Sequence, residues 1–165
     1  MAYKVLNNIL LKDVSASGLA SLKTDLLVLV INKETKTNAS FKDLNKISKN
    51  YISKTISSHL KESGNSVLLP NVDGINAKNL LLVKGLDKKD PIHKWLSMYQ
   101  SVAHKGNHIG SKDISVMPGS VTPNGKDEFW LIEIVSKTIE SNVYIFSETK
   151  NKTIKKPSVK KLTVL

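Results

Sequence analysis

The apolar run Leu26–Ile31 limits the fold more than any other segment of this chain. Its six consecutive aliphatic residues lack the alternation of apolar and polar residues that a half-exposed strand shows. Such a run predicts a β-strand that is buried on both faces, as in the parallel sheets of α/β proteins. The run is also the longest apolar stretch of the chain, and it is far shorter than the roughly 20 residues that a membrane-spanning helix needs.

Outside this run, apolar residues follow the periods of strands and helices in turn. Further strands are predicted over residues 3–11, 67–69, 80–83 and 113–117. Helices are predicted over residues 44–60, 91–106 and 124–143, where apolar residues recur at spacings of three and four. Residues 142–146 fit either the end of the last helix or, by propensity, a strand. The alternation favours an α/β layered fold with helices on both faces of a mixed sheet.

Glycine, proline and capping residues set the predicted helix boundaries. The first helix carries one unbroken apolar stripe, formed by Leu44, Ile47, Tyr51, Ile52, Ile56 and Leu60. Gly64 is predicted to end the first helix as a left-handed C-cap. The second helix is predicted to open at Pro91, with Asp90 as its cap, and to close at Gly106. Asn124 and Asp127 form a predicted capping pair at the start of the third helix.

The net charge of +11 comes from lysine alone, because the sequence has no arginine. Lysine is a hydrated point charge, so it supports salt-sensitive binding to polyanions better than base-specific readout. Biased codon usage is the alternative explanation. Residues 150–161 concentrate six lysines around one proline, which predicts an exposed arm or a solvated linker between domains. Nucleic-acid contacts, if the arm makes them, are expected from Lys150, Lys152, Lys155, Lys156, Lys160 and Lys161.

The chain has no cysteine, which excludes disulfides and thiolate metal sites and agrees with a reducing cytoplasm. Its first twenty residues lack the pattern of a secretory signal peptide. A cytoplasmic location without a membrane partner is therefore the expectation.

Three groups of residues are candidates for chemical sites. His104 and His108 have the spacing of a helical metal pair, but Gly106 between them is expected to separate their faces, and no third ligand is evident. Asp127 and Glu128 fit acid–base catalysis less well than a first helical turn, where negative charge complements the helix dipole. The loop 118–125 joins a strand to a helix, so it could hold phosphate or be an ordinary capped connection. His59 and His93 are expected at helix surfaces.

Two blocks of sequence carry a more specific pattern. The first joins residues 46–53 of the first helix to a turn at Gly64 and to the apolar runs 66–70 and 79–88. The second runs from Trp130-Leu131-Ile132 into Tyr144-Ile145-Phe146 and then into the basic, proline-containing residues 150–157. Together they resemble the N-terminal domain of the leucyl aminopeptidase (cytosol aminopeptidase) family over most of residues 40–165. One departure is Gly85-Leu86-Asp87, where relatives often have glycine-leucine-glycine.

The resemblance implies a macro-domain-like fold, a three-layer α/β/α arrangement with a mixed central sheet. It implies an N-terminal macro-like domain over residues 1–146 and a basic linker over 147–165 that leads toward an absent catalytic domain. The apolar end of the chain, residues 162–165, is likewise expected to continue into further sequence. The resemblance also favours a helical conformation for residues 142–144.

By the same resemblance, the full-length protein is a two-metal exopeptidase that removes N-terminal amino acids from peptides. Two bridging divalent metals, zinc or manganese, would lie in the absent catalytic domain, where they polarise the carbonyl and activate a water. The family's metal signature, asparagine-threonine-aspartate-alanine-glutamate-glycine-arginine, is absent here, and the superficial match Asn71-Val72-Asp73-Gly74 is a predicted turn. No catalytic or metal residue is therefore assigned to this chain.

The resemblance also bears on partners. The parent protein is expected to be a homohexamer assembled largely through catalytic domains, and the isolated domain a monomer whose partner is its own catalytic domain. Macro domains elsewhere bind ADP-ribose, and some bacterial relatives bind DNA. Two alternatives remain: a nucleic-acid-binding module, on the basis of the +11 charge and the lysine arm, and a macro-type nucleotide-binding module, on the basis of the fold resemblance.

Overall fold

The computed structural model describes residues 8–15, 18–32, 38–60, 64–143 and 158–165. The element order is β1 (Asn8–Leu11), α1 (Gly18–Ser21), β2 (Leu26–Ile31), α2 (Ala39–Ile47), α3 (Tyr51–Thr55), the π-helical turn η2 (Ile56–Leu60), β3 (Ser66–Pro70), β4 (Asn79–Lys84), α4 (Ile92–His108), β5 (Asp113–Met117), α5 (Glu128–Val143) and β6 (Lys161–Val164). Within these residues no helix is long and apolar enough to span a membrane.

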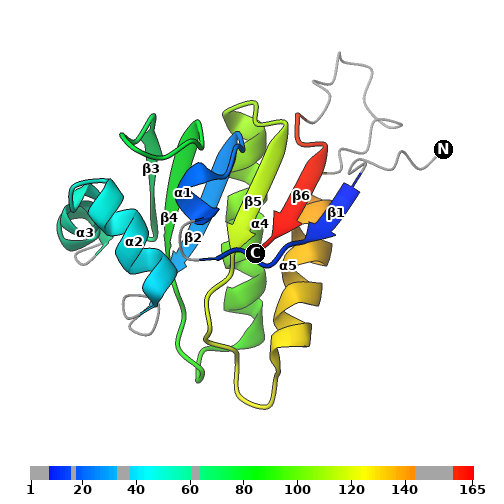
Figure 1. The fold of residues 1–165 in the computed structure, drawn as a ribbon. Helices are drawn as coiled ribbons and strands as arrows, with labels where there is room; N and C mark the ends of the chain where they lie inside the picture. Colours follow the sequence, from blue (N-terminus) through cyan, green and yellow to red (C-terminus); the bar gives the residue numbers. More distant parts are fainter. Residues whose placement is uncertain (1–7, 16–17, 33–37, 61–63, 144–157) are drawn as a thin grey trace.

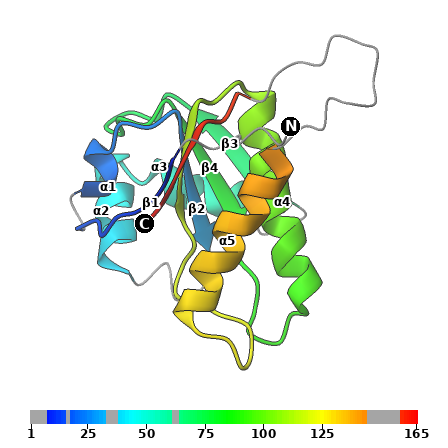
Figure 2. The same cartoon turned by 90° about the vertical axis from the view of Figure 1, so that its right-hand side faces the viewer.

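The strands form one mixed sheet in the order β1-β6-β5-β2-β4-β3. Strand β3 is antiparallel to β4, and the other neighbouring strands are parallel. Every residue of β2 is buried, as its continuous apolar run predicts. Val28 and Val30 join the core beneath α4 and α5, whereas Leu27 and Leu29 join the core beneath α1, α2 and α3. The predicted three-layer α/β/α arrangement is confirmed (Figures 1 and 2).

The two faces of the sheet are covered unequally. Helices α4 and α5 pack together across the core residues of β4, β2, β5 and β6 on one face. On the other face the described helices lie over β2, β4 and β3, and none lies over β6 and β1 (Figure 1). The side chains of Ser115 and Thr163 lie on this second face, where no described helix covers β6. Two neighbouring strands can therefore carry polar residues at paired positions, although both residues are buried.

The predicted first helix is wrong as a single element, because the chain breaks it between α2 and α3. Lys49 and Asn50 adopt left-handed conformations with φ of 52° and 63°. The Asn45 side chain stabilises the break: its amide donates to Asn50 Oδ1 at 2.8 Å, and its Oδ1 accepts the Ser53 N–H at 3.0 Å. Two members of the predicted apolar stripe are consequently half-exposed, Ile47 and Tyr51.

Two predicted glycine boundaries are also corrected. Gly64 does not have a positive φ; a Cβ atom there would stand 2.5 Å from the His59 carbonyl oxygen, so close approach explains the glycine. Gly106 does not end α4 but lies inside it, buried against β5, where a Cβ would meet Ile114 Cδ1 at 2.5 Å. The helix ends two residues later, before Gly110, which has φ of 72°.

The helix N-termini use different capping residues from those predicted. Asp127 itself caps α5, because its carboxylate accepts the Trp130 N–H at 2.8 Å, three residues ahead. Pro91 stands at the N-cap position of α4 and Asp90 precedes it, accepting the Asp87 N–H instead. Helix α5 continues through Asn142 and Val143, as the resemblance implies; residues 144–146 lie outside the described residues.

The predicted domain boundary at residue 146 is corrected by β6. Lys161–Val164 lies inside the sheet between β1 and β5, so these residues belong to the domain rather than to a linker. The apolar end of the chain is thus a buried strand, with Leu162, Thr163 and Val164 all buried. The remainder of the predicted linker up to residue 157, and residues 3–7 of the predicted first strand, lie outside the described residues.

Candidate functional site

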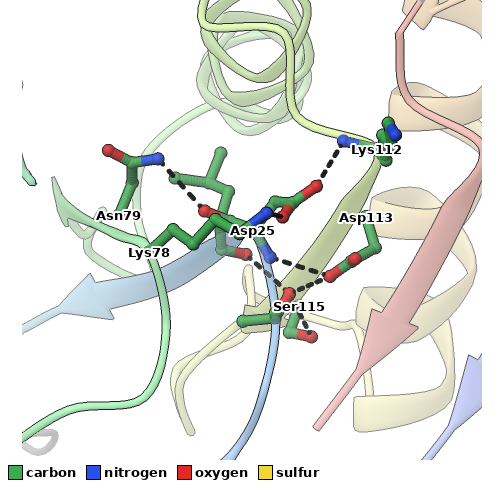
Figure 3. Close-up of polar contacts among 8 residues, drawn as sticks. Asp25, Lys78, Asn79, Lys112, Asp113 and Ser115 are labelled. Atoms are coloured by element: carbon green, nitrogen blue, oxygen red, sulfur yellow. Dashed lines mark hydrogen bonds and ion pairs between the residues drawn. The ribbon is translucent and has the colours of Figure 1, made fainter. Parts of the chain in front are cut away.

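The densest polar network of the described chain lies at the amino ends of β2, β4 and β5 (Figure 3). Asp113 opens β5, and its Oδ1 accepts the Asp25 N–H at 2.9 Å and the Thr24 hydroxyl. The Ser115 hydroxyl in turn donates to Thr24 Oγ1 at 3.2 Å. One carboxylate therefore joins the starts of two parallel strands that are 88 residues apart in sequence.

Asp25 extends the network to β4 and to the turn before β5. Its Oδ2 accepts the Lys112 N–H at 2.8 Å, and its Oδ1 pairs with Lys78 Nζ at 2.5 Å. The Asn79 side-chain amide donates to the Asp25 carbonyl at 3.2 Å. Burial alone would raise the pKa of the Asp25 carboxyl, but the hydrogen bonds from Lys78 and Lys112 outweigh it and hold this pKa below its usual value. The hydrogen bond between the side chains of Asp25 and Lys78 also raises the pKa of Lys78.

This geometry suits a structural role better than a catalytic one. Both carboxylates accept backbone N–H groups that the strand starts leave without a sheet partner. Within the described residues, the hydroxyls of Thr24 and Ser115 are engaged with each other and with Asp113. A general base needs a free lone pair directed at a substrate, and these groups use theirs to align three strands.

Exposed lysines form a row along the same edge. Lys23, Lys78, Lys112, Lys160 and Lys161 each stand at or just before the start of a parallel strand. Lys160 and Lys161 are among the predicted nucleic-acid contacts; Lys150, Lys152, Lys155 and Lys156 lie outside the described residues. Lys23, Lys78 and Lys112 are not predicted from the sequence as nucleic-acid contacts. A lysine just ahead of each buried apolar strand is the sequence signal that could have identified them. We call these five residues the lysine row.

A surface hollow of about 710 Å³ opens on the uncovered face of the sheet beside this edge. Ser115 and Thr163 form its buried floor, and the segment from Leu10 to Val14 borders it. Lys23 and Lys161 of the lysine row line its amino end with Asp113. The hollow therefore combines buried hydroxyls with a rim of mixed charge, where three lysines, Lys12, Lys23 and Lys161, accompany Asp13 and Asp113.

The opposite, carboxyl edge holds the position where ligands bind in open α/β sheets. The chain turns toward β4 and β3 after β2 but toward β6 after β5, so the adjacent ends of β2 and β5 form a topological switch point. A hollow of about 280 Å³ lies there, lined by residues that include Asp13, Asn38, Met117, Gly119, Ser120 and Glu128.

The chemistry of this second hollow is acidic. The predicted loop 118–125 contributes Gly119 and Ser120, and the predicted carboxylate pair divides between two tasks: Glu128 lines the hollow, and Asp127 caps α5. The N-terminus of α2 is likewise capped, because Asn38 Oδ1 accepts the Ser40 N–H at 2.8 Å. Both neighbouring helix N-termini have thus already engaged a side chain of their own.

The histidines lie apart from both hollows. His104 and His108 are exposed on one face of α4, so the expectation that Gly106 separates their faces is wrong. His93 is exposed in the first turn of the same helix, and His59 Nδ1 lies 2.6 Å from Ser58 Oγ. Within the described part of the chain, no group of three or more histidine, aspartate or glutamate side chains is placed to hold a metal ion.

Known proteins match this chain in sequence. A family model described as the N-terminal domain of the cytosol aminopeptidase family matches residues 27–153. A cytosol aminopeptidase of Haemophilus influenzae is 24% identical over 135 residues, which cover 79% of this chain and 27% of that protein. A probable cytosol aminopeptidase of Pseudomonas fluorescens is 27% identical over 152 residues, covering 88% of this chain and 30% of that protein. The chain thus spans less than a third of these relatives.

Solved structures share the fold. A tomato leucine aminopeptidase mutant superposes with a TM-score of 0.69 at 18% identity, covering 99% of this chain and 33% of that chain. A Trypanosoma brucei macrodomain in complex with ADP-ribose also gives a TM-score of 0.69, at 11% identity, covering 98% of this chain and 65% of that chain. The macro-like α/β fold expected from the sequence is confirmed.

Proposed function

Because the chain belongs to the cytosol aminopeptidase family and corresponds to its N-terminal domain, we propose that it serves as the non-catalytic domain of a larger metalloaminopeptidase. That enzyme would remove N-terminal amino acids from peptides in the cytoplasm. The observation that carries the proposal is the family match over residues 27–153, in a chain that spans less than a third of the named relatives. Its partner would be the catalytic domain of the same protein, and the parent a homohexamer.

The residues that the structure describes support placing the metal chemistry outside this domain. Two bridging metals need a set of carboxylate and other ligands on one site. The described residues offer no group of three or more such side chains, so the expected zinc or manganese pair does not fit them. The carboxylates of Asp25 and Asp113, at the amino ends of the strands, each accept a backbone N–H, and Asp25 also pairs with Lys78. The metal pair and the peptide-cleaving residues are therefore proposed for the catalytic domain.

Hydrolysis of leucine p-nitroanilide tests the non-catalytic part of the proposal. The purified chain, supplied with manganese or zinc, should release no more nitroaniline than the metal alone. The cytosol aminopeptidase of Haemophilus influenzae in the same buffer provides the positive control. Turnover that co-elutes with this chain on gel filtration and stops when a chelator is added would refute the proposal.

A macro-type nucleotide-binding role is the second candidate. The hollow at the switch point and the macrodomain solved with ADP-ribose favour it. Asp13 and Glu128 disfavour it, since two carboxylates in the lining repel a diphosphate, and both nearby helix N-termini are already capped. We rank it below the aminopeptidase role for that reason. A calorimetric titration with ADP-ribose that gives no heat would remove it.

Nucleic-acid binding is favoured by a different observation, the lysine row. Of the five exposed lysines along this edge, Lys78 pairs with Asp25, and the other four could contact phosphates without reading bases. Fluorescence anisotropy with duplex DNA should then show binding at low salt that weakens as salt rises. Replacing Lys112 and Lys161 with glutamine should reduce the salt slope by roughly 0.9 for each phosphate that is no longer neutralised. The same change at Lys42 and Lys46, on the outer side of α2, is the charge-matched control; equal effects of the two pairs would dismiss the lysine row as a site.

A further inference from the structure

His104 and His108 stand one turn apart on the solvent face of α4. They border one shallow surface hollow together with Ser97, Gln100, Ser101 and Lys105. Among the described residues, neither the packing of the helix nor the polar networks use either imidazole. We propose that this pair binds one divalent transition metal of the copper, nickel or zinc type, held by the two imidazoles with water in the remaining positions.

The backbone provides the geometry. Helix α4 is continuous from Ile92 to His108, and residues four apart on a helix have Cβ atoms about 5–6 Å from each other. Two histidines at this spacing on one helical face are the arrangement that zinc-binding helices use. Gly106 does not disturb it, because that residue faces the core against Ile114 and leaves the outer face of the helix regular.

The local charges also allow a cation. Lys105 is the nearest cationic side chain in sequence, but its Nζ donates to Ser66 Oγ of β3 at 2.6 Å and is thereby held by the neighbouring strand. His108 is the last residue of α4, the end at which the aligned peptide dipoles of a helix give a partial negative charge. A metal at the pair would therefore lie at the favourable end of the helix dipole.

The ligand set selects the class of metal. Two imidazoles without a carboxylate group suit copper, nickel and zinc, whereas magnesium and calcium require oxygen ligands. Since the described residues supply no third histidine, aspartate or glutamate there, the site keeps open positions and exchanges its metal readily. Binding would cross-link the last two turns of α4, next to the start of β5. This inference is independent of the aminopeptidase role.

Isothermal titration of the full chain, purified without a histidine tag, tests the site with nickel and zinc. One equivalent of metal should bind. Either His104→Gln or His108→Gln should weaken binding by about tenfold or more, because the second imidazole no longer acts as an intramolecular ligand. His93→Gln is the matched control, a lone exposed histidine on the same helix, and should leave the affinity unchanged. No binding, or binding that survives both substitutions, overturns the site.

Thermal unfolding gives a second readout that separates this site from scattered surface binding. A ligand that binds only the folded state raises its Tm. Zinc or nickel should raise the Tm of the unsubstituted chain and of His93→Gln, and magnesium should not. A metal-dependent rise that persists in His104→Gln would contradict the proposed pair. Circular dichroism of each variant before titration establishes that these exposed substitutions leave the fold intact.

Discussion

Replacing Asp113 with alanine should destabilise the domain more than any exposed charge change, because Asp113 joins the starts of β5 and β2. The substitution removes the acceptor of two hydrogen bonds, from the Asp25 N–H at 2.9 Å and from the Thr24 hydroxyl. A hydrogen bond to a charged acceptor contributes about 1.5–3 kcal/mol. Asp113 is only partly buried, so the lower value applies, and two bonds give a loss of about 3 kcal/mol. For a chain of this length that corresponds to a Tm lower by about 6–12 °C.

Two variants separate this cause from a general effect of lost charge. Asp113→Asn keeps an amide oxygen in the place of the acceptor and should lose only about 1 kcal/mol. Asp73→Ala removes a carboxylate whose ion pair with Lys49 is exposed by more than four-fifths on both sides, and it should change stability by less than about 0.5 kcal/mol. Urea unfolding followed by far-ultraviolet circular dichroism measures all three free energies. If Asp113→Ala matches Asp73→Ala, or if the asparagine variant is as damaging as alanine, the reasoning from the acceptor is refuted.

Because the pKa of Asp25 is lowered in the folded chain, the unfolded chain takes up a proton there at a higher pH, so this contribution to stability is present above pH 3.8 and is lost as pH falls through the folded-state pKa. The difference in free energy of unfolding between the unsubstituted chain and Asp25→Asn should therefore shrink on acidification. A difference that does not depend on pH would contradict this prediction. Asp127→Ala should cost about 1 kcal/mol by removing the cap of α5, whereas Asn124→Ala should be nearly neutral; equal losses in thermal melts would show that the cap is misassigned.

The sequence predicts those elements whose signals are local. The continuous apolar run of β2 and the three- and four-residue spacing in α4 and α5 depend only on near neighbours in sequence, and all three elements form as expected. The break between α2 and α3 escapes prediction because the apolar spacing continues across it, while the turn depends on side-chain hydrogen bonds of Asn45 that the spacing does not encode.

Elements that depend on distant partners are harder to predict. Strand β6 has four residues in a lysine-rich context, and it is a strand because β1 and β5 pair with it on both sides. The network at the amino edge is hidden for the same reason, because Asp25 and Asp113 are far apart in sequence and meet only when the parallel sheet forms. His104 and His108 are visible as a spacing, but the interpretation of Gly106 as a helix end conceals their shared face.

The reading frame downstream of Leu165 in the source gene tests the central claim most directly. We predict an open frame of roughly 300 further residues, the length of a second large domain, containing the two-metal signature of the cytosol aminopeptidases. A stop codon directly after Leu165 would contradict it. The chain would then be a stand-alone macro-like domain, and the lysine row and the carboxyl-edge hollow would become the sites to pursue.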